Sequence, residues 1–428
     1  MAPAASKLAH TDDGGSICDR LSALPDELVL HVLSFLQASE VVRTSVLSKR
    51  WKDLWRSVLS INLDFTDFFR GPSEPDPWRA TWVRMDNFVS NLLMLHEAPR
   101  LDAFRLTAHN VGHDSRRHFD TWIRRAIRGD PLVLKLWMMG FNGMDGFYRL
   151  PYLGSSSPCF RRLKRLKLAG GIVLDHSFAQ RLHSWWPQLE DLDLTHCYLG
   201  FSRIESYILK NLTIVYCKNP SVDGFVIRAP GLATLKLAIC SGSHGYRNGI
   251  SLYVGNSPAR ASIKLERGKF SPRCEAMILG SLVNAASLDL KNFQAMAILD
   301  KELFDKLPRF NNTRTLTLNS FGRNSSDCDV HNLKALGRIL QMSPNMENLT
   351  LEYYKVSKGS TARKGRKGKS KKTYPANMVR LHCPMLKSTE LIYYGRRNAS
   401  ILALHRFLQD ICSAPNNLIK FTNTKYCQ

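Results

Sequence analysis

Three histidines, His109, His113 and His118, are close enough in the sequence to suggest a zinc site. A structural zinc ion needs four ligands of histidine, cysteine or carboxylate type at fixed positions. Here the histidines fall in an expected loop after a strand, Arg116 and Arg117 stand among them, and no fourth ligand is close in the sequence. We therefore expect surface histidines and no metal site.

The remaining reactive side chains form no catalytic pattern. The ten cysteines are scattered without a CxxC pair, and the chain has no glycine-rich phosphate loop, GxSxG or HExxH motif. Residues 1–18 are small and polar without an apolar core, so we expect a disordered segment and no export signal. The sequence therefore predicts reduced thiols, a location in the nucleus and/or cytoplasm, no cofactor and no enzymatic activity.

Charge is the strongest feature of the composition. The 428 residues carry a formal net charge of +24, with 44% hydrophobic and 22% charged residues, which excludes a wholly disordered chain. No apolar run reaches the roughly 18 residues of a membrane span. A basic chain suggests nucleic acid, an anionic membrane or an acidic partner. Residues 1–60 are neutral, whereas residues 358–372 hold eight Lys/Arg and no acid. That glycine-containing run predicts a flexible loop, which is either an import signal, a nucleic-acid arm or a solvated segment.

Residues 19–60 predict three short helices. Pro25 precedes two acids, as in a helix first turn, and apolar residues follow at helical spacing. A second helix is expected from Glu40 to Leu47, and a third after Ser48, a suitable N-cap. So small a unit cannot bury its many apolar groups, and we expect it to lean on a partner or on the next domain.

From residue 101 onward an apolar-x-x-Leu-x-Leu motif recurs at periods of 20 to 28 residues, which is typical of leucine-rich repeats. Cys197, Cys217 and Cys240 each follow the last leucine of a strand by three residues, the position where this repeat has Asn or Cys. Periods lengthen toward the C-terminus. There we expect one more strand, an amphipathic helix and a last short strand near Asn417, which together cap the array.

The segment DRLSALPDELVLHVLSFL, followed by RTSVLSKRWKDLW, closely resembles an F-box. With the repeats and CPMLKSTELIYYG behind it, the chain resembles plant F-box/leucine-rich-repeat proteins that carry a C-terminal FBD segment. The resemblance implies an α/β fold: an F-box at 19–60, an irregular repeat solenoid at 61–375 with a parallel sheet on its concave face, and an FBD-like cap at 376–428.

The resemblance also implies the partners. It makes the chain the substrate-recognition subunit of an SCF-type cullin ubiquitin ligase, whose F-box binds a Skp-type adaptor and, through it, cullin and ring-finger subunits. By position, the implied adaptor contacts are Leu24, Pro25, Leu28, Val32, Leu33, Leu36, Val42, Leu47, Trp51 and Leu54. Two alternatives stay open: a basic nucleic-acid-binding repeat protein, although no nucleic-acid fold is recognised, and a non-degradative F-box scaffold.

The target should meet the open face of the sheet. In Leu-x-Leu the middle side chain points away from the core, and Asp191 and Asp193 interrupt an otherwise positive set of such positions. We therefore expect an acidic or phosphorylated target, although these charges could equally serve only to keep the sheet soluble. The candidate target-binding residues are Arg105, Lys135, Arg165, Lys167, Lys236 and Lys264.

Overall fold

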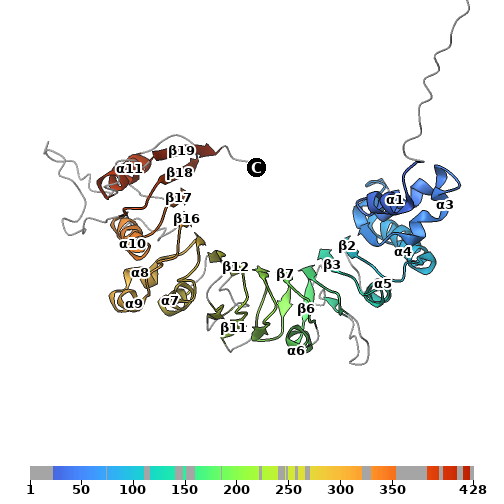
Figure 1. Ribbon diagram of the computed structural model, residues 1–428, viewed down its shortest axis with the longest axis horizontal. Coiled ribbons are helices and arrows are strands. Elements are labelled where there is room, and N and C mark those ends of the chain that lie inside the picture. The colour runs from blue at the N-terminus through green and yellow to red at the C-terminus, as the bar shows by residue number, and fades with distance from the viewer. Residues whose placement is uncertain are drawn as a thin grey trace, which may run out of the picture.

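The computed structural model describes residues 23–73, 75–109, 116–139, 148–150, 160–184, 186–220, 224–239, 246, 249–255, 259–265, 270–320, 329–352, 383–394, 399–411 and 418–424. These residues form an open arc whose inner face is one long sheet and whose outer face carries helices toward both ends (Figure 1). The predicted disordered segment 1–18 and the basic run 358–372 lie outside the described residues.

The inner sheet has thirteen parallel strands in the described part of the chain, and each strand lies beside the next one of the sheet in sequence order. This ordering is what a repeat solenoid requires, because each repeat packs only on its neighbours. The strands are β1 (Ser60–Asp64), β2 (Ala103–His109), β3 (Val133–Met139), β5 (Arg165–Gly170), β7 (Asp191–Thr195), β10 (Asn211–Val215), β12 (Thr234–Ile239), β14 (Arg260–Leu265), β15 (Ser287–Lys291), β16 (Thr315–Asn319), β17 (Asn348–Glu352), β18 (Ser388–Tyr394) and β19 (Leu418–Thr424).

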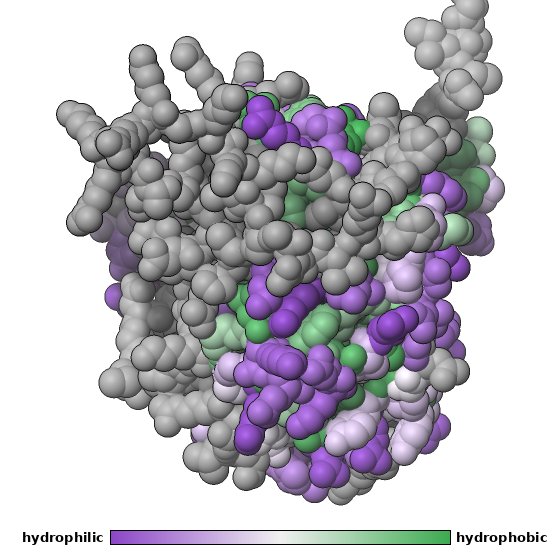
Figure 2. Space-filling model, turned by 90° about the vertical axis from the view of Figure 1, so that its left-hand side faces the viewer, coloured by the Kyte–Doolittle hydropathy of each residue, from purple (hydrophilic) through white to green (hydrophobic). Residues whose placement is uncertain are grey.

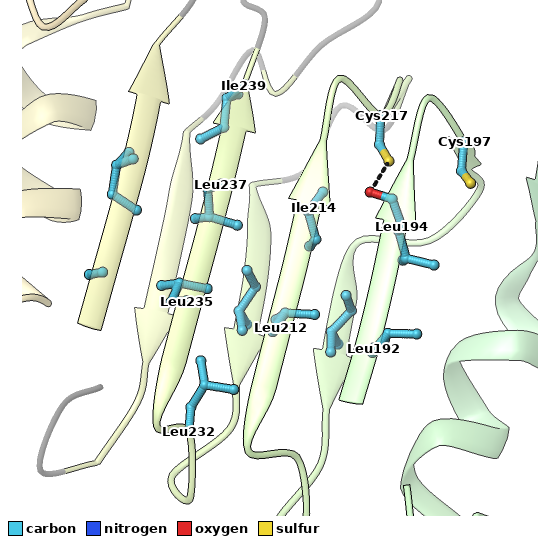
Figure 3. Close-up of a cluster of buried hydrophobic side chains, with 14 of the residues drawn as sticks. Leu192, Leu194, Cys197, Leu212, Ile214, Cys217, Leu232, Leu235, Leu237 and Ile239 are labelled. Atoms are coloured by element: carbon cyan, nitrogen blue, oxygen red, sulfur yellow. Dashed lines mark hydrogen bonds between the residues drawn. The ribbon is translucent and has the colours of Figure 1, made fainter. Parts of the chain in front are cut away.

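The register places the motif leucines in continuous rows. Leu192 lies beside Leu212, which lies beside Leu235, and all three side chains are buried. Alternation along each strand turns these side chains to the convex side and the intervening ones to the concave side. Figure 3 shows the rows pointing into one core. The predicted sheet and its leucine core are therefore confirmed.

The turns after the strands use their cysteines as hydrogen-bond donors. The thiol of Cys197 donates to the carbonyl of Leu168 at 3.3 Å. The thiol of Cys217 donates to the carbonyl of Leu194, also at 3.3 Å (Figure 3). These carbonyls belong to the preceding strand, so each buried cysteine ties two repeats together. Cys240 lies outside the described residues.

The convex side changes along the arc. Helices cover both ends: α4 (Pro77–Leu95) and α5 (Arg116–Arg128) on the N-terminal side, and α7 (Pro272–Gly280), α8 (Met296–Leu299), α9 (Lys301–Lys306), α10 (Asp329–Met342) and α11 (Ala399–Ile411) on the C-terminal side. A further helix, α6 (His176–Ser184), lies in the middle of the arc (Figure 1). Beside α6, the middle has two small parallel sheets, made of β4 (Tyr148–Arg149), β6 (Ile172–Leu174) and β8 (Tyr198–Leu199), and of β9 (Arg203–Glu205), β11 (Phe225–Arg228) and β13 (Ile250–Tyr253). At the C-terminal end, Figure 2 shows hydrophilic residues gathered over the lower half, between smaller hydrophobic patches.

The N-terminal helices stand at one end of the arc. They are α1 (Asp26–Leu33), α2 (Ala38–Arg43), α3 (Trp51–Leu54) and the short 3-10 turns η1 (Thr44–Val46), η2 (Trp55–Ser57) and η3 (Phe65–Phe68). Their own core is small and consists of Val29, Leu33, Val41, Trp51 and Val58.

The N-terminal helices also pack on the repeats, as predicted. Ala38 and Val42 contact the main core of the array. Asn62 on β1 donates to the carbonyls of Ser34 (3.1 Å) and Leu36 (2.8 Å), just after α1. The helical unit is therefore bonded to the first strand as well as packed on it.

Two features of the sheet differ from the sequence expectation. The motif was expected only from residue 101 onward, whereas β1 adds an earlier strand to the sheet. Its residues Val58, Ile61 and Leu63 follow the same motif spacing. In β14, Ile263 lies beside Leu237, so Ser262 and not Lys264 lies beside Lys236. The expected register was wrong there by two residues, because Ala261 fills the first leucine position.

Candidate protein-binding surfaces

Helix α1 divides its apolar side chains between two faces. Val29 and Leu33 point into the small N-terminal core, whereas Leu28, Val32 and Phe35 are 51%, 52% and 73% exposed. Their spacing of four and three residues places the exposed ones on one side of the helix and its last turn. We call Leu28, Val32 and Phe35 the α1 stripe. Apolar rows of this kind mark interaction sites when a protein leaves them uncovered.

The structure distributes the predicted adaptor contacts over three environments. Pro25, Leu28, Val32 and Leu47 are exposed, and Leu24, Leu36, Val42 and Leu54 are half-buried. Leu33 and Trp51 are only 1% and 8% exposed. Both side chains fill the core that holds the three helices together, so they are not open to a partner in this structure.

Two exposed apolar side chains of this surface were not among the predicted adaptor contacts. Phe35 ends the α1 stripe, and Val46 in η1 is 85% exposed. Helical spacing pointed to Phe35, but it was missing from the predicted contacts. The ring of His31 meets Phe35 edge-on, with centroids 5.1 Å apart, and so supports it from the same helix.

Arg50 fixes the start of α1. Its Nε donates to Oδ1 of Asp26 at 2.8 Å, and its guanidinium also donates to the carbonyl of Leu24. The arginine therefore bonds the chain before α3 to the first turn of α1. This contact orients the exposed Pro25 and Leu28 relative to the rest of the helical unit.

The concave face carries one row of registered side chains across all thirteen strands. It runs through Asn62, Arg105, Lys135, Lys167, Asp193, Thr213, Lys236, Ser262, Asp289, Thr317, Thr350, Glu390 and Lys420. We call this set the concave row. Three consecutive cations stand at neighbouring strands β2, β3 and β5, which lie about 4.8 Å apart.

Acids within the sheet partly neutralise the predicted positive surface. Lys167 Nζ lies 2.7 Å from Oδ2 of Asp193, and Arg165 Nε lies 3.0 Å from Oδ2 of Asp191. Each pair joins β5 to β7. Two of the candidate target-binding cations therefore already have carboxylate partners, as the interruption by these aspartates suggested.

The other candidate cations have different surroundings. Arg105 donates to Oδ1 of Asn62 at 2.7 Å, a neutral partner that also holds α1. Lys264 lies over the ring of Tyr216, with Nζ 5.1 Å from its centroid. Among the described residues, no carboxylate lies within salt-bridge distance of Lys135 or Lys236.

The two described histidines of the candidate zinc set, His109 and His118, have other partners. His118 Nδ1 lies 2.8 Å from Oδ1 of Asp86, and the carbonyl of His109 accepts from the Trp82 indole. His113 lies outside the described residues. Among those that are described, no three His, Cys, Asp or Glu side chains are grouped to hold an ion. In the same part of the chain, no helix has the length and apolar character needed to cross a bilayer.

Comparison with known proteins finds matches to the N-terminal helices and to the repeat array behind them. The F-box domain model matches residues 21–62. A rice (Oryza sativa subsp. japonica) protein named "MEIOTIC F-BOX protein MOF" is 30% identical over 92% of this chain and 84% of its own length. An FBD-associated F-box protein of Arabidopsis thaliana is 32% identical over 64% of each chain. An F-box/FBD/LRR-repeat protein of the same plant is 28% identical over 50% of this chain and 54% of its own. With its F-box, its parallel repeat sheet and these relatives, the chain belongs to the plant family of F-box/FBD/LRR-repeat proteins.

Proposed function

We propose that this protein is the substrate-recognition subunit of an SCF-type cullin ubiquitin ligase. F-box proteins with leucine-rich repeats serve in general as non-catalytic ubiquitin-ligase adaptors, and the F-box match at residues 21–62 is the observation that carries the proposal. In this proposal the N-terminal helices bind a Skp-type adaptor, and through it cullin and ring-finger subunits. The concave face holds the target.

The α1 stripe supports the adaptor part of the proposal. Its three side chains are apolar, uncovered and carried by a helix whose other face is locked into a core. Residues 1–60 have balanced charges, so hydrophobic burial supplies most of the binding free energy in this proposal. Such a contact depends little on salt, unlike binding to nucleic-acid phosphates, which weakens steeply as salt is added.

The protein contributes proximity and no bond-making chemistry in this role. Holding a target beside a ubiquitin carrier converts an encounter in solution into one with a high effective concentration. A rigid connection between the two binding surfaces serves this purpose, and the bonds of Asn62 to the end of α1 supply one.

For the target we propose an acidic or phosphorylated segment on strands β2 and β3. Lys135 has no carboxylate partner among the described residues, and Trp137 lies two residues further along the same face, 40% exposed. A cation beside an open aromatic ring offers both charge and apolar area to a bound peptide.

The adaptor contact is tested by charge insertion into the α1 stripe. The variant Leu28→Glu/Val32→Glu should lose at least tenfold in affinity for a purified Skp-type protein, because interface anchors cost on the order of 2 kcal/mol or more when removed. The matched control is Leu402→Glu, which changes an exposed leucine of α11 at the far end of the arc. Unchanged adaptor binding by the double variant, with its circular dichroism preserved, would reject this surface.

The target part is tested by reversing the cations on the concave row. Targets are first identified by affinity purification with and without proteasome inhibition, which also separates a degradative receptor from a non-degradative scaffold. Arg105→Glu/Lys135→Glu should then lower target capture at least tenfold while adaptor binding persists. The control Lys291→Glu/Lys420→Glu makes the same change of net charge on the concave face, at two cations outside the candidate set that already have carboxylate partners. If both double variants lose target capture equally, the target does not bind specifically at these cations of β2 and β3.

We also propose a nuclear and/or cytoplasmic location. The eight Lys/Arg at 358–372 support import, because short basic runs are typical of nuclear-import signals. A fluorescent fusion lacking residues 358–372 should accumulate less in the nucleus than the full chain. An unchanged distribution would remove the import role of this segment.

A further inference from the structure

The convex side carries a groove that the proposed function does not use. It lies between α4 and α5 and encloses about 480 Å³, with Leu93, Met94, Trp122, Arg124, Arg125 and Arg128 among its lining residues. These helices lie side by side on the outside of the arc, opposite the concave row (Figure 1). The groove is therefore separate from the candidate target-binding face.

The floor of the groove is apolar and has no unmet hydrogen-bond donor. Leu93 and Trp122 are buried, and the Trp122 Nε1–H donates to the hydroxyl of Ser90 at 3.4 Å. Met94 is 70% exposed on the wall, far more than a methionine that serves only the core. A flexible, polarisable side chain of this kind is suited to binding apolar groups of varied shape.

The rim is positively charged. The two helices together contain seven arginines and two aspartates. Both aspartates have partners of their own: Asp86 lies 2.8 Å from His118 Nδ1 and accepts from the Ser90 hydroxyl at 3.2 Å, and Asp120 accepts the hydroxyl of Tyr148. Among the described residues that line the groove there is no carboxylate, and no ion pair joins Arg125 or Arg128 to one of these lining side chains.

From this combination we propose that the α4–α5 groove binds an acidic protein segment that also presents apolar side chains. Arg125 and Arg128 are one helical turn apart and exposed, so their guanidinium groups can reach two carboxylates of one segment. Arginine binds carboxylates in a planar, two-bond geometry, which gives such a contact direction as well as charge. The apolar side chains of the segment cover Met94 and the floor.

The probe is a fluorescein-labelled peptide of three Glu-Glu-Leu-Leu repeats, followed by fluorescence anisotropy with the full chain. We expect saturable binding to the wild type and at least tenfold weaker binding to Arg125→Glu/Arg128→Glu. Met94→Ser should weaken binding at least threefold. The matched control Arg273→Glu/Arg406→Glu reverses two exposed arginines on α7 and α11 and should stay within twofold of the wild type.

Several outcomes would overturn the proposal. The proposal fails if the peptide does not bind the wild type. It also fails if Arg273→Glu/Arg406→Glu weakens peptide binding as much as Arg125→Glu/Arg128→Glu does. Equal affinity for a Glu-Glu-Ser-Ser peptide would show charge attraction without use of the apolar floor. Arginine-dependent binding to phosphatidylserine vesicles, with no binding of the peptide, would assign the groove to a membrane surface. Adaptor binding is measured on the same variants, so failure of the groove and failure of the proposed function are distinguishable.

Discussion

Replacing Asn62 by alanine should loosen the N-terminal helices from the repeat array. The amide Nδ2 donates to the carbonyls of Ser34 and Leu36, and Oδ1 accepts from Arg105 at 2.7 Å. Each bond contributes about 1 kcal/mol, and the one to the charged guanidinium more. Because the site is half-buried and water can replace part of this bonding, we expect a loss of about 2 kcal/mol. That loss corresponds to a roughly thirtyfold change in an opening equilibrium.

Hydrogen exchange measured by mass spectrometry reports on that opening directly. Amides of α1 and α2 should exchange roughly thirtyfold faster in Asn62→Ala, whereas those of β15 and β16 should keep their rates. Asn62→Asp is the informative second variant, since it keeps the acceptor for Arg105 but places a carboxylate against the two carbonyl oxygens. Asn348→Ala on β17 removes an exposed asparagine and serves as control. Wild-type exchange in α1 for both Asn62 variants would refute the reasoning.

Three further predictions concern buried and half-buried groups of the described structure. Glu275 is 1% exposed and accepts from backbone N–H groups at the start of α8, so Glu275→Ala should lower the free energy of unfolding by on the order of 3 kcal/mol in urea titrations, and Glu275→Gln by less. Cys217→Ala should cost about 1–2 kcal/mol by the same assay, whereas Cys217→Asn keeps a donor for the Leu194 carbonyl and should cost less. Burial lowers the pKa of His96, whose Nε2 lies 2.8 Å from the Val58 carbonyl. The unfolded chain therefore binds the imidazole proton more tightly than the folded chain, so the free energy of unfolding should fall as pH drops below about 6.5. In thermal melts between pH 7.5 and 5.5, His96→Asn should lessen that fall.

Much of the candidate adaptor surface could be predicted because helical periodicity converts sequence spacing into a face. Leu28, Val32 and Phe35 share one side of α1 for that reason alone. Spacing did not reveal that Leu33 is buried, since both faces of α1 are apolar, and it did not decide whether Trp51 of α3 is buried either. Packing of α1 against α2 and α3 decides which of them turns inward.

The α4–α5 groove shows the opposite case. Its wall residue Met94 and its arginines are about thirty residues apart in the sequence, and no motif links them. The sequence shows that α5 is basic, but only the packing of the two helices places that charge beside an apolar floor. The same packing brings His118 to Asp86 and so leaves the groove without an acid.

The sequence by itself determined the parallel sheet, its leucine core and the face to which each strand residue belongs. Those properties follow from local rules, because alternation and repeat period act within a few residues. Only the tertiary structure decided which charges meet. Lys167 and Asp193 are 26 residues apart, and their 2.7 Å contact exists because β5 and β7 are in register. Register depends on the side chains that fill the core, as the two-residue shift at Ala261 shows. The contacts that neutralise the concave face and join it to the N-terminal helices therefore appear only in the folded array.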